Sequence, residues 1–190
     1  MGHQKPNTLH TFSEVSNILA PSNEPWQVEL HDPATSVMTD FRVRALFKVD
    51  PEDTIDEALQ KMKIAGLRIG FVVDAASQKI LGMITSYDIM GEKPMRYLQS
   101  VGFADRGVTH NDIKVKDIME RVEDWVSVEM KNVESVTVQG LLDAFQRTGR
   151  THLPVLDHKD GKEHHLCGLF SSAKVLRLTD FARRKAAHPK

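Results

Sequence analysis

The sequence LGMITSYDIM, residues 81–90, is echoed by CGLFSSAKVL, residues 167–176. Each copy reads as an apolar strand interrupted by a glycine, followed by a hydroxyl residue at the point where a helix is expected to begin. Asp88 stands three positions after Thr85 in the first copy, and Lys174 stands three positions after Ser171 in the second. The chain therefore contains the same turn twice, with the charge at one position reversed.

The two turns belong to a longer internal repeat, whose segments align at offsets between 81 and 86 residues. The offset changes only where loops are expected, which indicates a duplication followed by loop insertions. The aligned pairs are 36–39 with 117–121, 54–66 with 137–149, 70–74 with 153–157, and Gly82 with Gly168.

Each copy begins with the same predicted elements. A short helix carries Met38 or Met119, and the strand after it is RALFKV (44–49) or WVSVEM (125–130). An amphipathic helix follows, because its apolar residues recur at helical spacing. We expect Thr54 and Thr137 to cap this helix at its N-terminus, and Gly66 and Gly149 to end it.

Two strands and a last helix complete each copy. The strands are IGFVV (69–73) and ILGMIT (80–85) in the first copy, and HLPVL (152–156) and HLCGLF (165–170) in the second. The segment WQVEL (26–30) is expected to add one more strand. Since a copy of this size buries little surface alone, the two are expected to pack against each other.

Composition favours a soluble globular protein. The 190 residues are 41% apolar and 27% charged, and the formal net charge of −1 argues against a broad nucleic-acid-binding face. The single cysteine and the lack of an apolar leader or spanning segment predict a cytoplasmic location, with no membrane association. No nucleophile–base pair or standard metal motif is recognisable, so neither an enzyme nor a metal site is expected.

The order of these motifs, repeated at matching offsets, resembles the CBS domain, named after cystathionine β-synthase, in two tandem copies. The resemblance implies an α+β fold of two β-α-β-β-α units, packed through their sheets with pseudo-two-fold symmetry. It also implies a regulatory homodimer that binds AMP, ADP, ATP or S-adenosylmethionine between the units and acts through a partner protein. The boundaries expected are 1–32 for an N-terminal lead-in, 33–98 and 114–180 for the domains, 99–113 for the connecting loop and 181–190 for a basic tail.

Thr85 and Asp88 are the candidate ribose-binding residues. The spacing alone fits a capping box that needs no ligand. A carboxylate can, however, also accept hydrogen bonds from both hydroxyls of a ribose, and the resemblance implies this role for both residues. Capping and ribose binding can coexist.

Lys174 departs from the family pattern, because an ammonium has no acceptor for a diol. It also opposes the helix dipole. Two interpretations remain open: Lys174 supplies charge to a phosphate in the same cleft, or the site is degenerate and the side chain points to solvent. Ser171 remains a candidate cap and phosphate contact.

The resemblance also implies a basic residue two positions before the Pro-Val pair of HLPVL, which makes His152 and the nearby Arg150 candidate phosphate contacts. Because side chains alternate along a strand, we expect only one of the two to face the cleft. His152 would bind phosphate better when protonated. The first copy thus retains the ribose acceptor and the second supplies cations, which favours a single nucleotide site. A ligand-free dimerisation or docking module is the alternative, and the loss of the acidic residue at Lys174 supports it.

Overall fold

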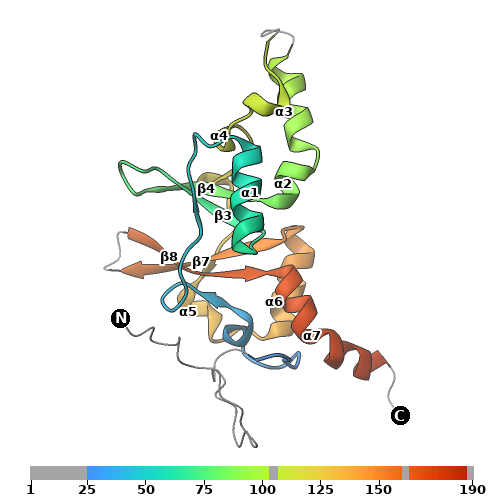
Figure 1. The fold of residues 1–190 in the computed structure, drawn as a ribbon. Coiled ribbons are helices and arrows are strands. Elements are labelled where there is room, and N and C mark those ends of the chain that lie inside the picture. The colour runs from blue at the N-terminus through green and yellow to red at the C-terminus, as the bar shows by residue number, and fades with distance from the viewer. Residues whose placement is uncertain (1–24, 103–106, 160–162, 188–190) are drawn as a thin grey trace, which may run out of the picture.

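The structure is a computed structural model that describes residues 25–102, 107–159 and 163–187. Most of the expected lead-in (1–32), residues 103–106 of the expected connecting loop and the end of the expected basic tail (181–190) lie outside these ranges. The described chain forms two sheets covered by helices, so the α+β fold class is confirmed (Figure 1).

Each sheet contains four strands among the described residues, in mirrored order. We name the sheets by their central strands. The β3–β4 sheet has the order β2 (Lys48–Val49), β3 (Ile69–Val73), β4 (Ile80–Thr85) and β5 (Glu120–Arg121). The β7–β8 sheet has the order β6 (Val128–Glu129), β7 (His152–Lys159), β8 (Glu163–Ser171) and β1 (Thr39–Asp40).

The edge strands are exchanged between the copies. Strand β1 comes from the first copy but pairs antiparallel with β8, and β5 comes from the second copy but pairs antiparallel with β4. In Figure 1 the blue chain accordingly runs from β1, beside β8, up to α1 beside β3. Each sheet therefore takes three strands from one copy and one from the other, an arrangement with pseudo-two-fold symmetry.

Two glycines allow this exchange. Gly82 lies opposite Arg121, and Gly168 lies opposite Asp40, at corresponding points of the two ladders. A Cβ atom on Gly82 would lie 2.3 Å from the backbone oxygen of Glu120, so only glycine lets β5 approach β4 this closely.

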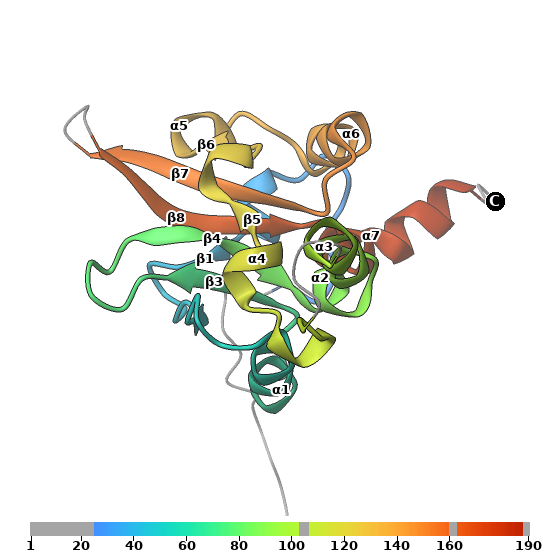
Figure 2. The same ribbon diagram turned by 90° about the horizontal axis from the view of Figure 1, so that it is seen from above.

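The main helices cover the outer faces of the sheets (Figure 2). Against the β3–β4 sheet lie α1 (Ile55–Ala65), α2 (Ser86–Met90), α3 (Lys93–Val101) and α4 (Val115–Ile118), and α5 (Met130–Val133), α6 (Val138–Thr148) and α7 (Ser172–Ala187) lie against the other. Short 3₁₀ turns span Ala34–Val37 (η1), His110–Asp112 (η2) and Val122–Asp124 (η3).

The predicted helix ends are confirmed. The Thr54 hydroxyl accepts from the backbone N–H of Glu57, and the Thr137 hydroxyl accepts from that of Gly140. Both helices end at a glycine in the left-handed region, Gly66 with φ of 66° and Gly149 with φ of 64°. The duplication therefore repeats the chemistry of the helix ends as well as the apolar pattern.

The exchanged segments are buried in the core of the opposite copy. Val37 of η1 packs with Leu141 and Phe145 of α6, and Ile118 of α4 packs with Ile55 and Val72. A third cluster joins the sheets, with Phe71 and Met83 from one and Leu169 from the other. Burial of each large apolar side chain contributes about 1.5–3 kcal/mol, so these contacts fix the two copies relative to each other.

Several strand boundaries differ from those predicted. RALFKV and WVSVEM contain only the two-residue strands β2 and β6, because the residues before each strand carry the chain from one sheet to the other. WQVEL forms no strand; instead Val28 is buried and its N–H donates to the backbone oxygen of Leu178. In the second copy, β7 and β8 extend three and two residues further into their hairpin than predicted. None of the described helices is long and apolar enough to cross a lipid bilayer.

Candidate functional site

A cleft of about 470 Å³ lies between the two copies, at the N-terminus of α2. We call it the Asp88 cleft. The structure brings four of the six predicted site residues to this cleft, two from each copy: Thr85, Asp88, Arg150 and His152. Its other lining residues are Met83, Tyr87, Glu92, Lys93, Arg96, Glu120, Gly149 and Thr151.

Thr85 and Asp88 form the predicted capping box. Asp88 Oδ2 accepts from the backbone N–H of Thr85 at 2.8 Å and from its hydroxyl at 2.7 Å, and the Thr85 hydroxyl accepts from the N–H of Asp88 at 3.1 Å. Thr85 is buried, whereas the Asp88 side chain remains 20% exposed. The box therefore holds the carboxylate at the cleft wall, where a ligand could reach it.

The second carboxylate oxygen of Asp88 faces a lysine. Lys93 Nζ lies 2.8 Å from Asp88 Oδ1 and donates to the backbone oxygen of Ile118 at 3.3 Å. Lys93 is the first residue of α3, and the short break between α2 and α3 returns it to the mouth of the cleft. Asp88 is thus neutralised locally by a side chain that is 41% exposed and can turn elsewhere.

A second ion pair crosses the cleft, between two residues of the second copy, one on the exchanged strand β5 and one just before β7. Arg150 Nη1 lies 2.7 Å from Glu120 Oε1, and its Nη2 donates to the backbone oxygen of Asp124 at 3.1 Å. Burial raises the pKa of the Glu120 carboxyl, an effect that the charges of Arg150 and Lys93 oppose. The positive charge of Arg150 therefore stabilises the ionised form of Glu120, which burial disfavours.

His152 lies at the start of β7 and is largely buried. Burial lowers the pKa of its imidazole, and the charge of Asp88 opposes this shift. A neutral ring can donate one hydrogen bond to a phosphate but adds no positive charge. Either Nδ1 or the Thr151 hydroxyl donates in the 3.1 Å contact between them.

The expectation that only one of Arg150 and His152 faces the cleft is wrong, since both line it. Strand alternation does not apply to this pair, because β7 begins only at His152 and the chain bends at Thr151. Sequence reasoning also missed Lys93 and Glu120. In the sequence, Glu120 directly follows Met119, the methionine that recurs in both copies. Its place in the cleft depends on the pairing of β5 with β4, which the sequence does not predict.

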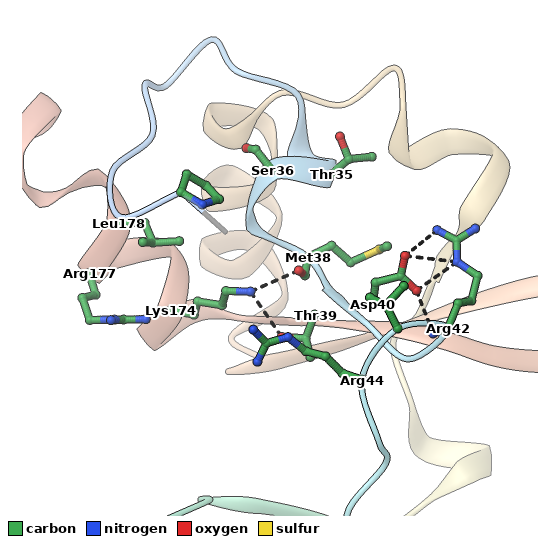
Figure 3. Close-up of a pocket in the computed structure, with 12 residues that line it drawn as sticks. Thr35, Ser36, Met38, Thr39, Asp40, Arg42, Arg44, Lys174, Arg177 and Leu178 are labelled. Carbon is green, nitrogen blue, oxygen red and sulfur yellow. Dashed lines mark hydrogen bonds and ion pairs between the residues drawn. The ribbon is translucent and has the colours of Figure 1, made fainter. Parts of the chain in front are cut away.

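Lys174 lies in a different cleft, of about 380 Å³, which is lined by residues around η1 and β1 of the first copy and by α7 of the second (Figure 3). We call it the Lys174 cleft. The ammonium group is half-buried and donates to the backbone oxygen of Met38 at 3.1 Å and to Thr39 Oγ1 at 3.4 Å. The interpretation that Lys174 points to solvent is therefore wrong.

Ser171 lines neither cleft. It is the last residue of β8, and within the described residues its hydroxyl makes no capping hydrogen bond to α7. Ser171 is paired with His152 across β7 and β8 without lining the Asp88 cleft itself, and Lys174 lines the other cleft. Within the described ranges, no group of three or more His, Cys, Asp or Glu residues is arranged to hold a metal ion.

This sequence and fold are similar to those of known CBS-domain proteins. Residues 34–94 match the family model of the CBS domain. The described fold is shared with CBSX2, a CBS-pair protein of Arabidopsis thaliana solved in complex with AMP, at 20% identity and a TM-score of 0.50 over 83% of this chain and 99% of that one. Residues 34–94 thus match one CBS domain, and the two copies together share the fold of these CBS-pair structures.

Two archaeal structures share this fold. Protein MJ1225 of Methanocaldococcus jannaschii, considered a homologue of g-AMPK, has 19% identity and a TM-score of 0.52 over 76% of this chain, which spans 49% of that protein's length. A conserved protein of Pyrococcus horikoshii has 19% identity and a TM-score of 0.52 over 86% of this chain and 97% of its own. A search of curated protein sequences finds no significant match.

Proposed function

We propose that the Asp88 cleft binds an adenine nucleotide and that the protein, as a homodimer, reports the bound nucleotide to a partner protein. The observation that carries this proposal is the meeting, in one cleft, of a diol acceptor from the first copy and phosphate donors from the second. A nucleotide needs both kinds of group, because its ribose offers two hydroxyl donors and its phosphates are anionic.

The local ion pairs suggest how a nucleotide would enter. Asp88 Oδ1 is held by Lys93, whose exposed ammonium can move to a phosphate and so release that oxygen for the ribose hydroxyls. Arg150 and His152 approach the same cleft from the opposite copy and would meet the phosphate. Met83 and Tyr87 offer apolar surface against which the base could pack.

Two related structures support the choice of ligand. CBSX2 was solved in complex with AMP, and MJ1225 is considered a homologue of g-AMPK. A ligand bound between the copies could regulate a partner, because it shifts their relative arrangement whenever it prefers one arrangement over another.

One observation favours a ligand-free structural module instead. Both oxygens of Asp88 already have partners, Thr85 and Lys93, and Arg150 is already paired with Glu120. The polar groups of the cleft are thus satisfied by the protein itself, and dimerisation or docking would need nothing more.

Calorimetric titration with AMP, ADP, ATP and S-adenosylmethionine distinguishes the two functions. We expect Asp88→Asn to weaken binding of the preferred nucleotide about 10- to 100-fold, since hydrogen bonds to a charged acceptor are worth about 1.5–3 kcal/mol. Asp112→Asn is the matched control, because Asp112 accepts the same two hydrogen bonds, from the backbone N–H and hydroxyl of Thr109, outside both clefts.

Unchanged affinity in Asp88→Asn would refute the site. If none of the four compounds binds the wild type at millimolar concentration, the structural module is the correct function.

A further inference from the structure

Two histidines face each other near the end of the β7–β8 hairpin. His158 on β7 is the cross-strand partner of His164 on β8, and their ring centroids lie 4.3 Å apart. Residues directly opposite each other in an antiparallel pair lie on the same face of the sheet, so the two imidazoles share one side of the hairpin. Both residues are exposed, and neither lines the Asp88 cleft or the Lys174 cleft.

A carboxylate lies beside this pair. Glu129 of β6 is paired with Leu156 of β7, two residues before His158, and side chains two positions apart in a strand point to the same face. Glu129 Oε1 accordingly lies 3.6 Å from His158 Nε2. The other oxygen, Oε2, is held by Lys131, which also lowers the pKa of the Glu129 carboxyl. Glu129 is therefore ionised, with one oxygen beside the imidazole.

This arrangement occurs in the second copy alone. The corresponding hairpin of the first copy, residues 74–79, contains no histidine. The two histidines lie in the part of β7 and β8 that extends beyond the predicted strands, at the opposite end of these strands from α6 and α7 (Figure 2). The pair is therefore neither part of the repeat nor part of the two clefts described above.

The distances between these groups suit a metal ion. Two imidazoles that bind one ion at about 2.0–2.1 Å in adjacent positions have ring centroids about 4.5–5 Å apart, close to the 4.3 Å between His158 and His164. Imidazole binds zinc, copper and nickel in preference to magnesium or calcium. A carboxylate beside a metal-bound imidazole orients the ring and raises its basicity, and Glu129 lies where it could do so. The pairing of the strands brings the histidines together, so their spacing in the sequence matches no standard motif.

We propose that His158 and His164 chelate a divalent transition-metal ion of the class of Zn²⁺, with Glu129 supporting His158. Within the described ranges no group of three His, Cys, Asp or Glu residues forms a complete set of ligands, so water would fill the remaining positions. A bound ion would join the two strands of the hairpin and stabilise the folded chain, in which alone the pair is formed. This inference does not depend on nucleotide binding in the Asp88 cleft.

Calorimetric titration of the full chain with Zn²⁺ and with Mg²⁺ tests the proposal, above the ordinary imidazole pKa of about 6.5. We expect Zn²⁺ to bind at this site and Mg²⁺ not to bind. His158→Gln and His164→Gln should each weaken zinc binding at least about tenfold, because a chelate needs both imidazoles. The variant with both substitutions should lose little more than either one alone. Glu129→Gln should weaken binding about tenfold, as loss of a carboxylate that orients a metal ligand does.

His110→Gln is the matched control. His110 is also an exposed imidazole beside a carboxylate, with Nδ1 3.8 Å from Asp56 Oδ2, but within the described residues it faces no second histidine. Its replacement should leave zinc binding unchanged, and so should Asp88→Asn, which tests the nucleotide site. Because His158 and His164 are exposed, their variants should be as stable as the wild type without metal, which urea denaturation checks.

The proposal is overturned if Zn²⁺ does not bind the wild type, or if Mg²⁺ binds equally well. It is equally overturned if His158→Gln and His110→Gln have the same effect. Additive losses from the two histidine substitutions would also overturn it, because they would mean that each imidazole binds an ion separately.

Discussion

The two clefts occupy corresponding places in a duplicated fold, yet their chemistry is opposite. In each, a lysine ammonium donates to a backbone oxygen at the end of a short helix, Lys93 to Ile118 and Lys174 to Met38. In the first cleft an aspartate neutralises that lysine, whereas the lysine of the second lies among arginines. The same backbone frame therefore surrounds two clefts that differ in the charges of a few side chains.

The backbone of the two copies is less symmetric than the sequence repeat suggests. The largest expected difference is at Gly82 and Gly168, the glycines that face the exchanged strands. A Cβ on Gly82 would meet the rigid backbone oxygen of Glu120 at 2.3 Å, whereas a Cβ on Gly168 would meet the Met38 sulfur at 2.9 Å and the backbone oxygen of Thr39 at 3.1 Å. The sulfur belongs to a flexible side chain that can move, and the Thr39 oxygen would have to shift far less than the Glu120 oxygen.

We expect Gly82→Ala to destabilise the fold by about 2 kcal/mol or more, and Gly168→Ala by about 1 kcal/mol, as overpacking does in tightly packed regions. Urea denaturation of both variants measures the difference. Equal effects would mean that the two exchanged strands are equally free to shift.

The ion pair between Arg150 and Glu120 gives the next largest effect and is a property of the Asp88 cleft. Arg150→Ala leaves the Glu120 carboxylate, 20% exposed, without its cation. We expect a loss of about 1–3 kcal/mol at neutral pH. The double variant Glu120→Gln with Arg150→Ala should recover part of this loss, since no unpaired charge remains.

The effect should also depend on pH, because burial raises the pKa of Glu120 above its ordinary value of 4.5. A carboxyl with a raised folded pKa favours folding when protonated, and this contribution is lost as pH rises from its unfolded pKa through its folded pKa. Loss of Arg150 raises the folded pKa further, so the variant should approach wild-type stability near pH 4. A destabilisation that is constant between pH 4 and pH 7 would show that Glu120 is not its cause.

Much of the fold could be predicted because its signals are local. The caps at Thr54 and Thr137 and the left-handed glycines Gly66 and Gly149 are specified by neighbouring residues, and each signal occurs twice. The strand exchange could not be predicted, since a two-residue strand such as β1 has no periodicity, and its partner β8 is distant in sequence.

The same limit applies to the candidate site. Asp88 and Thr85 form a local motif and could be selected from the sequence. Arg150 and His152 were selected through the family resemblance, and the fold brings them to Asp88. Glu120 reaches this cleft only through the exchanged strand, and Lys174 is kept from it because it belongs to the equivalent turn of the other copy.

The smallest effect concerns the helices behind the two clefts, α1 and α6. Glu57 completes a capping box by accepting from the backbone N–H of Thr54 at 2.8 Å, but the corresponding position in α6 is Gly140, which has no side chain. Glycine also lowers helix stability through its backbone freedom. The first copy therefore has the better helix start.

Gly140→Glu should make the two helices equivalent and stabilise the protein by about 1 kcal/mol. There is room for the side chain, because a Cβ at Gly140 would lie 3.5 Å from Val136 Cγ1 and 3.6 Å from Thr137 Oγ1, which is ordinary contact. Urea denaturation of Gly140→Ala and Gly140→Glu separates the two causes. Alanine reports helix propensity alone, so a glutamate variant no more stable than the alanine variant would show that no capping box forms at Thr137.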